Sequence, residues 1–164
     1  MKRAVIPGTF DPITNGHLDV IERASLLFEE IIIAVAASEG KNGQGPLFSS
    51  QQRVDMILTA TKHLDNVEVK SFNNLLVDFA REVDADCIVK GLRAVTDFEH
   101  EFQMSALNWH MNSKIETMFI MAVPDNMYLS SSAVKEIVKH DGSVEGLVPK
   151  GVESLLIEKL RSNS

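Results

Sequence analysis

Two patterns of hydrophobic residues alternate along this chain. Short runs are apolar without interruption, as in Ile31-Ile32-Ile33-Ala34-Val35. A strand that is covered on both faces has this pattern, and parallel sheets flanked by helices consist of such strands. The strands that we predict on this basis are residues 3–7, 31–37, 67–70, 87–90 and 116–123.

Amphipathic segments with a helical period lie between and after these runs. The first carries Val20, Ile21, Ala24, Leu27 and Phe28 on one face, as expected of a helix packed against a core. The second opens with Ser-x-x-Gln at residues 49–52, the pattern of a capping box. The predicted helices are residues 17–29, 49–63, 75–83, 98–111, 133–139 and 152–160.

The alternation of strands and helices with short connections indicates right-handed βαβ units. We therefore expect an α/β fold with a single Rossmann-like, doubly wound parallel five-stranded sheet and helices on both faces. The length of 164 residues suits one domain that spans residues 1–164. Ligands of such sheets bind beyond the carboxyl ends of the strands, where the strand order reverses.

Composition and charge narrow the classes of function. The chain has 16 basic and 23 acidic residues, a formal charge of −7, which argues against a nucleic-acid partner. No apolar run approaches the about 18 residues that a membrane span needs, and no secretory signal is recognisable, so we expect no membrane partner. The single cysteine, Cys87, lies in an apolar stretch and suits a reducing, cytoplasmic environment.

The segment after the first strand, Gly8-Thr9-Phe10-Asp11-Pro12-Ile13-Thr14-Asn15-Gly16-His17, leads directly into a helix. Thr14 or Asn15 can cap that helix, which leaves its first N–H groups free to face an anion. His17 then places an imidazole beside the same site. Helix signals alone are equally compatible with such an anion site and with an ordinary capped helix that carries an exposed histidine.

This segment resembles the T/H-x-G-H signature of the nucleotidyltransferase α/β-phosphodiesterase superfamily, and more narrowly that of the bacterial phosphopantetheine adenylyltransferase family. Two further segments are similar to that family, Lys90-Gly91-Leu92-Arg93 with the residues that follow it, and Leu129-Ser130-Ser131-Ser132-Ala133-Val134-Lys135. Three motifs in this order, over about residues 3–160, are a far more specific signal than one Thr-x-Gly-His.

The resemblance implies that the adenylyl group of ATP is transferred to the phosphate of 4′-phosphopantetheine, giving dephospho-coenzyme A and pyrophosphate. It implies Mg²⁺ delivered with ATP, no protein metal site, and coenzyme A as a feedback ligand. The reaction needs two polyanions to be aligned and the charge on the α-phosphate to be stabilised, so positioning and electrostatics should dominate catalysis.

The resemblance also assigns roles to residues. His17 is implied as the catalytic group that stabilises the transition state, and Asp11 is implied to line the reacting phosphates. For the acceptor it implies Thr9, Lys41, Leu76 and Lys90. For ATP it implies Thr9, Phe10, His17, Gly91, Leu92, Arg93, Glu101, Asn126, Met127, Tyr128, Leu129, Ser130, Ser131 and Ser132.

Several of these residues have simpler explanations. Lys41 lies in a Gly-rich loop where a lysine is ordinarily solvated, and Leu76 is an ordinary core leucine by its pattern. Glu101 falls in the first turn of the helix predicted at 98–111, where an acidic residue favours the helix dipole. The three serines at 130–132 suit a helix cap. Lys90 replaces the arginine of many family members, which keeps the charge but loses the bidentate fork.

Two alternative functions fit the same residues. One is a related transferase with another acceptor, such as nicotinate mononucleotide or glycerol 3-phosphate. The other is a non-catalytic nucleotide sensor, in which Lys41 and Lys90 would have no acceptor to bind.

The helix predicted at 98–111 is apolar on two sides, which is typical of a helix buried on both. One stripe is Phe98, Phe102 and Trp109, and the other is Met104, Leu107 and Met111. The family is hexameric, so the resemblance implies a homo-oligomer with this helix at an interface.

Overall fold

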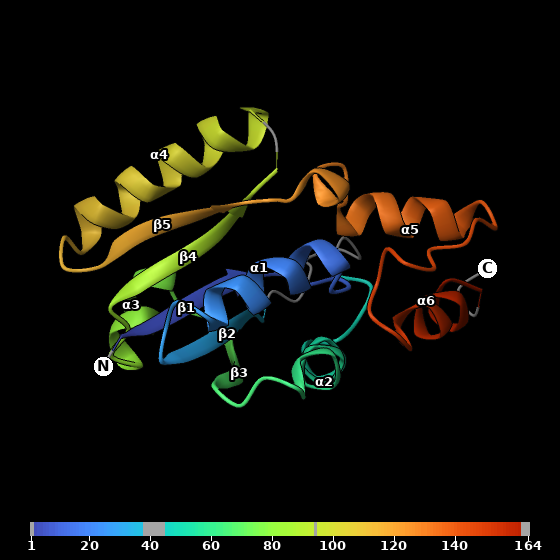
Figure 1. Ribbon diagram of the computed structural model, residues 1–164, viewed down its shortest axis with the longest axis horizontal. Helices are drawn as coiled ribbons and strands as arrows, with labels where there is room; N and C mark the ends of the chain where they lie inside the picture. Colours follow the sequence, from blue (N-terminus) through green and yellow to red (C-terminus); the bar gives the residue numbers. More distant parts are fainter. Residues whose placement is uncertain (1, 38–44, 94, 162–164) are drawn as a thin grey trace.

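The computed structural model describes residues 2–37, 45–93 and 95–161, and its centre is a five-stranded parallel sheet (Figure 1). The strands are β1 (Arg3–Gly8), β2 (Glu30–Ala36), β3 (Val67–Phe72), β4 (Cys87–Leu92) and β5 (Glu116–Met121). Their order in the sheet is β3-β2-β1-β4-β5. The parallel five-stranded α/β fold expected from the sequence is confirmed.

Both faces of the sheet are covered by apolar side chains, which explains the uninterrupted hydrophobic runs. Ala4 and Ile6 of β1 belong to one core cluster and Val5 to the other, since successive residues of a strand point to opposite faces. The first cluster includes Ile21 of α1 (Asn15–Ser25) and Ile57 of α2 (Ser50–Thr61). The second cluster includes residues of α3 (Leu76–Glu82). Helices therefore cover both faces, as expected.

Three further helices complete the described structure. Helix α4 (Val95–Met111) runs beside β5 at one margin of the sheet (Figure 1). Helices α5 (Ser131–Lys139) and α6 (Val152–Arg161) lie beyond the ends of the strands, and a 3-10 turn, η2 (Pro124–Asn126), leads from β5 towards α5. No helix in the described part of the chain is long and apolar enough to cross a membrane.

Several predicted boundaries differ from the structure by a few residues, and two of these differences have local reasons. Helix α1 ends at Ser25, four residues before the predicted end, and Leu27 is 64% exposed instead of packed on the core. The chain must turn there to enter β2 at Glu30. Strand β5 ends at Met121 because Pro124, at the first position of η2, lacks the N–H that a ladder needs.

The strand order reverses between β1 and β4, which lie side by side at the middle of the sheet. The connections from β1 lead through β2 to β3 on one side, and those from β4 lead to β5 on the other. The carboxyl ends of these two strands, at Gly8 and Leu92, open the position at which such sheets bind ligands.

The two margins of the sheet carry different side chains. On β3, Glu68 and Lys70 form an ion pair at 2.8 Å, and both side chains are about half exposed. On β5, Met118 and Met121 are exposed instead. One margin is therefore charged and the other apolar.

Arg53 of α2 is the largest fully buried side chain among the described residues. Its guanidinium donates to the carbonyl oxygens of Thr9, at 2.7 Å, Ala36, at 2.8 Å, and Phe48, at 3.2 Å. Burial lowers the pKa of this guanidinium, and the negative charge of Asp11 opposes that shift. Three chain segments that are distant in sequence thus share one buried cation.

We expect Arg53→Met to lower the free energy of unfolding by ~3 kcal/mol, because three carbonyl groups lose the donor that satisfies them in the interior. Urea titration followed by circular dichroism measures this change. Arg81→Met is the matched control, since Arg81 is 70% exposed and pairs only with Asp78 in the same helix; its expected change is within ~0.5 kcal/mol. Equal midpoints for the two variants would contradict the structural role of Arg53.

Candidate active site

A cleft of about 440 Å³ lies at the carboxyl ends of β1 and β4. This volume falls within the range of ordinary ligand pockets. Of the residues expected in the site, the cleft brings together Thr9, Phe10, His17, Lys90, Gly91, Arg93, Glu101, Asn126, Leu129, Ser130, Ser131 and Ser132. Segments more than one hundred residues apart in sequence therefore meet where the strand order predicts a ligand site.

The turn after β1 is shaped by a close contact between Gly8 and Phe10. A Cβ atom at Gly8 would lie 2.8 Å from the Phe10 ring, so only glycine fits there. Phe10 has a φ of 51°, is 3% exposed, and packs edge-on against the ring of His17 with centroids 5.1 Å apart. The motif thus holds the imidazole from one side through an aromatic contact.

A capping box fixes the other side of His17 and assigns its protons. Thr14 is the N-cap of α1 and His17 is the third residue of the helix. The Thr14 N–H donates to His17 Nδ1 at 3.0 Å, and the His17 N–H donates to Thr14 Oγ1 at 3.3 Å. Because Nδ1 accepts a hydrogen bond from the backbone, the ring proton of the neutral imidazole is placed on Nε2.

Burial keeps this imidazole neutral. Removal of the ring from water, together with the smaller effect of the nearby positive charge of Arg93, lowers the pKa of His17 to about 4. At neutral pH, His17 is therefore an uncharged donor with one available N–H, at Nε2. Such a group can hydrogen-bond an anionic oxygen but has no extra proton to give away.

Positive charge enters the cleft from the end of β4. Lys90 Nζ lies 2.5 Å from a carboxylate oxygen of Glu101, and both side chains are about four-fifths buried. Arg93 donates to the carbonyl oxygen of Leu129 at 2.9 Å. Gly91 between them packs tightly, since a Cβ atom there would lie 3.0 Å from Val20 of α1. Lys90 and Glu101 were expected to serve different substrates, and the structure pairs them.

The serine segment forms the N-terminus of α5 at the cleft. Ser130 is its N-cap, and the Ala133 N–H donates to Ser130 Oγ at 3.1 Å. Ser131 Oγ donates to the carbonyl oxygen of Pro12 at 2.8 Å, and Ser132 lines the cleft. The segment is thus both a helix cap and part of the pocket wall, and a helix N-terminus favours anions.

Four expected site residues in the described part of the chain are not among those that line the cleft. Leu92 is 6% exposed, whereas Met127 and Tyr128 project outwards, Tyr128 with 90% exposure. Leu76 lies on α3 and packs against the core cluster on the opposite face of the sheet. Lys41 lies outside the described residues. The implied binding roles of these residues stay predictions.

Two positions differ from the sequence interpretation. Asp11 is 4% exposed, and its carboxylate is occupied by the Leu47 and Phe48 N–H groups and by Lys135, so it does not face the cleft. Glu101 lies in the second turn of α4, because this helix begins at Val95 and not at residue 98. An effect of the helix dipole on Glu101 is therefore no longer an adequate explanation for its position.

The sequence analysis missed several residues that line the cleft. Pro7, Thr14, Val20 and Ala122 belong to its wall. Thr14 carried a recognisable signal, as the candidate cap beside His17. Val20 and Ala122 looked like ordinary core residues, and only the three-dimensional arrangement brings them to the pocket.

Among the residues that the structure describes, no group of three or more His, Cys, Asp and Glu side chains could hold a metal ion. The side-chain oxygens at the cleft are the carboxylate of Glu101, which is paired with Lys90, the amide oxygen of Asn126, and the threonine and serine hydroxyl groups. With one carboxylate among them they form no dedicated cage, and they fit a cation that keeps most of its ligands from a substrate and water.

Comparison with known proteins shows to which class of protein the chain belongs. The family model described as cytidylyltransferase-like matches residues 5–137. The fold is similar to a solved structure from Vibrio parahaemolyticus, whose proposed assignment is nicotinate-nucleotide adenylyltransferase. The TM-score is 0.71 and the identity 16%, over 96% of this chain and 99% of that one. The chain is thus a nucleotidyltransferase of the cytidylyltransferase-like class.

Relatives with higher sequence identity show to which family within this class the chain belongs. Two phosphopantetheine adenylyltransferases from Clostridium botulinum, strains Eklund 17B and Alaska E43, are 52% and 51% identical over 159 residues. In each case the match covers 97% of this chain and 98% of the relative. The chain belongs to the phosphopantetheine adenylyltransferase family, as its three motifs indicated.

We expect His17 to remain neutral, with its proton on Nε2, from pH 8 down to about pH 5. The measurement is a ¹⁵N-imidazole NMR titration of the free protein, with His17→Gln used to assign the signal. Because the folded state holds this ring at a pKa of about 4 against an ordinary 6.5, its share of stability is full above pH 6.5. That share is lost as the pH falls from 6.5 through 4. A titration midpoint near 6.5 would contradict the assignment.

Proposed function

We propose that this chain transfers the adenylyl group of ATP to 4′-phosphopantetheine. An oxygen of the acceptor phosphate forms a bond to the α-phosphorus of ATP, and the bond from that phosphorus to the bridging oxygen of the β-phosphate breaks. The products are dephospho-coenzyme A and pyrophosphate, so the step belongs to coenzyme A biosynthesis. The observation that carries the proposal is the neutral His17 Nε2–H held in the cleft of about 440 Å³ beside Lys90, Arg93 and the N-terminus of α5.

His17 stabilises the transition state as a hydrogen-bond donor. Its Nε2–H donates to an α-phosphate oxygen, whose charge increases as the acceptor attacks. The Phe10 ring and the Thr14 N–H hold the imidazole before substrates bind, so little reorganisation is needed at the moment of reaction. No proton transfer is required of His17, because the acceptor phosphate is already an anionic nucleophile.

The cations and the α5 N-terminus oppose the repulsion between the two substrates. Lys90 binds the acceptor phosphate, and Arg93 with Ser130, Ser131 and Ser132 binds the triphosphate. In the free protein Glu101 compensates the charge of Lys90 at 2.5 Å, so acceptor binding must compete with this pair. Glu101 in turn contacts ATP, and the two substrate sites therefore share one ion pair.

Mg²⁺ enters with ATP and neutralises part of the triphosphate charge when bound. The serine hydroxyl groups and the carboxylate of Glu101 are among the protein oxygens at the cleft that could approach it. The chain's own residues supply orientation: the α5 N-terminus aligns the phosphates, and Thr9 lies between the nucleotide and the acceptor.

The acceptor is recognised at the opposite side of His17 from the nucleotide. Thr9, Lys41, Leu76 and Lys90 are the residues that the family resemblance assigns to it, and the nucleotide wall includes Asn126 and Leu129. Coenzyme A, which contains the same pantetheine chain, competes for this site as a feedback ligand.

We place the protein in the cytoplasm, where Cys87 stays reduced. Its thiol is buried, and burial raises its pKa to about 11, so it is protonated at neutral pH.

We expect the wild-type protein with ATP and Mg²⁺ to release pyrophosphate when 4′-phosphopantetheine is added, and not with nicotinate mononucleotide or glycerol 3-phosphate. His17→Ala should lower kcat by ~10²-fold or more, because a preorganised donor to the developing charge is lost. A coupled pyrophosphate assay measures both effects.

His63→Ala is the matched control for the histidine substitution. His63 pairs with Glu22 on the surface, away from the cleft, so its loss should leave kcat unchanged. Turnover of nicotinate mononucleotide would point to the alternative acceptor. ATP binding by calorimetry with no binding of 4′-phosphopantetheine would favour the nucleotide sensor. Full turnover by folded His17→Ala would remove the proposed role of His17.

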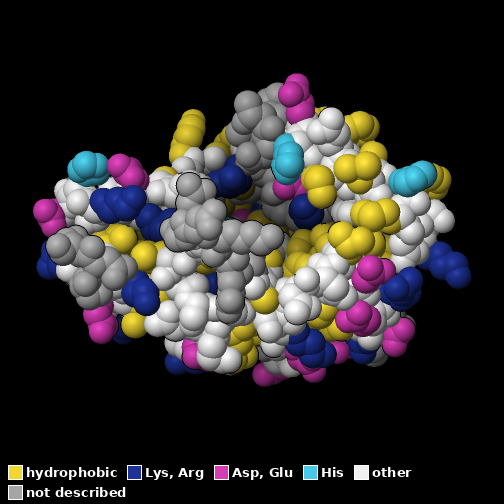
Figure 2. Space-filling model, turned by 180° about the vertical axis from the view of Figure 1, so that it is seen from behind, with side chains coloured by type: hydrophobic (Ala, Val, Ile, Leu, Met, Phe, Trp, Pro, Cys, Tyr) yellow, Lys and Arg dark blue, Asp and Glu magenta, His cyan; other side chains and the backbone are white. Residues whose placement is uncertain are grey.

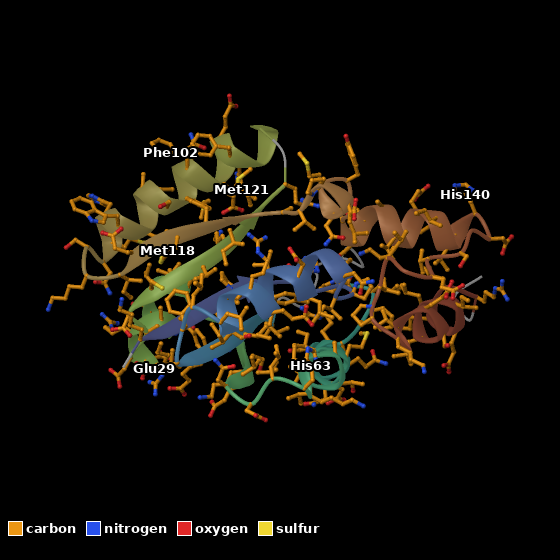
Figure 3. All side chains as sticks on the ribbon, viewed as in Figure 1. Glu29, His63, Phe102, Met118, Met121 and His140 are labelled. Atoms are coloured by element: carbon orange, nitrogen blue, oxygen red, sulfur yellow. The ribbon has the colours of Figure 1, made fainter. Side chains whose placement is uncertain are left out.

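The protein also assembles with further copies of itself, as a hexamer, through the surface formed by α4 and β5. On α4, Phe98, Phe102, Leu107, Trp109 and Met111 are all 48–61% exposed, so neither apolar stripe of this helix is covered within the described chain. Figure 2 shows hydrophobic side chains gathered over this part of the molecule, and Figure 3 places Phe102, Met118 and Met121 along it. Apolar patches of this extent ordinarily mark an interface.

We expect Phe102→Glu to dissociate the assembly, because it buries a charge in that interface. Size-exclusion chromatography with light scattering gives the mass of each species. Leu26→Glu is the control, since Leu26 is 86% exposed at the end of α1 and lies outside this surface. A wild-type monomer of 18.2 kDa at micromolar concentration would refute the assembly.

A further inference from the structure

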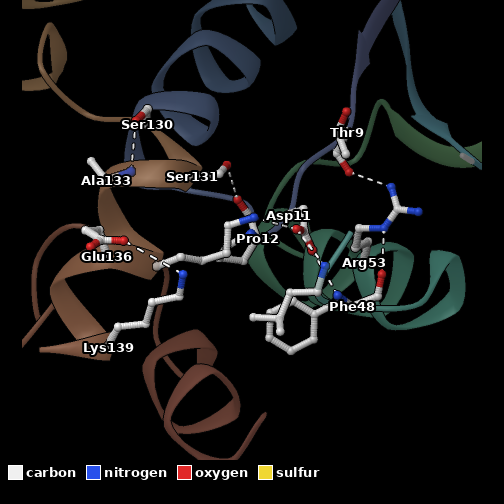
Figure 4. Close-up of polar contacts among 12 residues, drawn as sticks. Thr9, Asp11, Pro12, Phe48, Arg53, Ser130, Ser131, Ala133, Glu136 and Lys139 are labelled. Atoms are coloured by element: carbon white, nitrogen blue, oxygen red, sulfur yellow. Dashed lines mark hydrogen bonds and ion pairs between the residues drawn. The ribbon is translucent and has the colours of Figure 1, made fainter. Parts of the chain in front are cut away.

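The carboxylate of Asp11 joins three parts of the chain without facing the cleft. It accepts hydrogen bonds from the N–H groups of Leu47, at 2.8 Å, and Phe48, at 2.9 Å. It also forms an ion pair with Lys135 Nζ at 2.7 Å (Figure 4). The Asp11 side chain is 5% exposed, so these contacts are shielded from water.

Helix α5 is attached to the β1–α1 segment at two points on one side of the helix. Ser131 donates to the carbonyl oxygen of Pro12, and Lys135 pairs with Asp11, the preceding residue (Figure 4). Residues four apart lie on the same side of a helix, so both contacts form together. The N-terminus that holds the three serines is therefore anchored to the same peptide segment as Thr9.

The third part, residues 47–48, is held from both sides. The Phe48 N–H donates to Asp11, and its carbonyl oxygen accepts from Arg53, which also binds the carbonyl oxygen of Thr9. Asp11, Phe48 and Arg53 thus form a closed set of contacts around Thr9. Lys135 is the connection from this set to α5.

We propose that Lys135 is a positioning residue for adenylyl transfer, which acts through Asp11 to fix the α5 N-terminus relative to Thr9 and residues 47–48. This inference rests on the proposed function. Lys135 is not among the residues that line the cleft, and its ammonium is directed to Asp11. Removal of the Lys135 side chain deletes no group that lines the cleft. It changes only how these groups are positioned relative to one another.

Such a change should appear in kcat and hardly in KM. We expect Lys135→Met to lower kcat ~10- to 100-fold, since small errors in the alignment of reacting groups have effects of this size. The KM for ATP should change by less than about threefold, because the binding groups remain. Lys135→Arg, which can still reach Asp11, should restore most of the activity.

Lys139→Met is the matched control, because Lys139 lies one turn further along α5, is 56% exposed, and pairs only with Glu136. Its kcat should equal that of the wild type. A combined variant, Lys135→Met with Asp11→Asn, tests the route. If Lys135 acts through Asp11, the double variant should be no slower than Asp11→Asn alone. A further full loss in the double variant would show that Lys135 contacts substrate directly, and would overturn the proposal.

Amide hydrogen exchange at Leu47 and Phe48 provides a measurement that does not depend on turnover. Lys135→Met should speed exchange at these two amides in the free protein, and Lys139→Met should not. If the wild type releases no pyrophosphate with any acceptor, the proposed function fails. The amide exchange rates still test whether Lys135 acts on residues 47–48 through Asp11. If Asp11→Asn does not fold, the kcat and the amide exchange of Lys135→Met, together with the rescue by Lys135→Arg, test the proposal. Unchanged exchange in Lys135→Met, or no rescue by Lys135→Arg, would overturn the proposal.

Discussion

The active site depends on two opposite charges that are buried side by side beneath it. Arg53 has no direct carboxylate partner in the described structure and is solvated by three backbone carbonyl groups, while Asp11 receives two backbone N–H groups and Lys135. Each charge is costly to bury unless its hydrogen bonds are made. The hydrogen bonds and the ion pair that offset the cost of burying Arg53 and Asp11 therefore also fix the geometry of the β1–α1 segment.

The imidazole of His17 is held rigidly although it follows a loop. The backbone of Thr14 fixes the tautomer of His17, the Phe10 ring fixes its orientation, and Gly8 leaves room for that ring. Burial keeps the ring neutral. The helix cap uses Nδ1 of His17 and leaves Nε2–H available, so the cap is compatible with the proposed donation to phosphate.

The sequence was sufficient for the order and type of the elements, because the buried central strands leave continuous apolar runs and helix-period segments alternate with the strands. Its motifs also indicated His17, Lys90, Arg93 and the serine segment, which the structure brings to one cleft. It could not place Asp11, whose contacts involve amides 36 and 37 residues away, or pair Lys90 of β4 with Glu101 of α4. Val20 and Ala122 carry no chemical signal at all, so their place in the cleft follows only from packing.

The difference between the two outer strands has a consequence for association. Edge strands expose unpaired backbone groups that invite other chains, and charged side chains on such a strand discourage pairing. The Glu68–Lys70 pair protects β3 in this way, whereas the methionines of β5 do not. Sheet-to-sheet growth through β3 would have to strip water from both ions. Strand pairing between copies is therefore disfavoured along β3, and β5 lacks that protection.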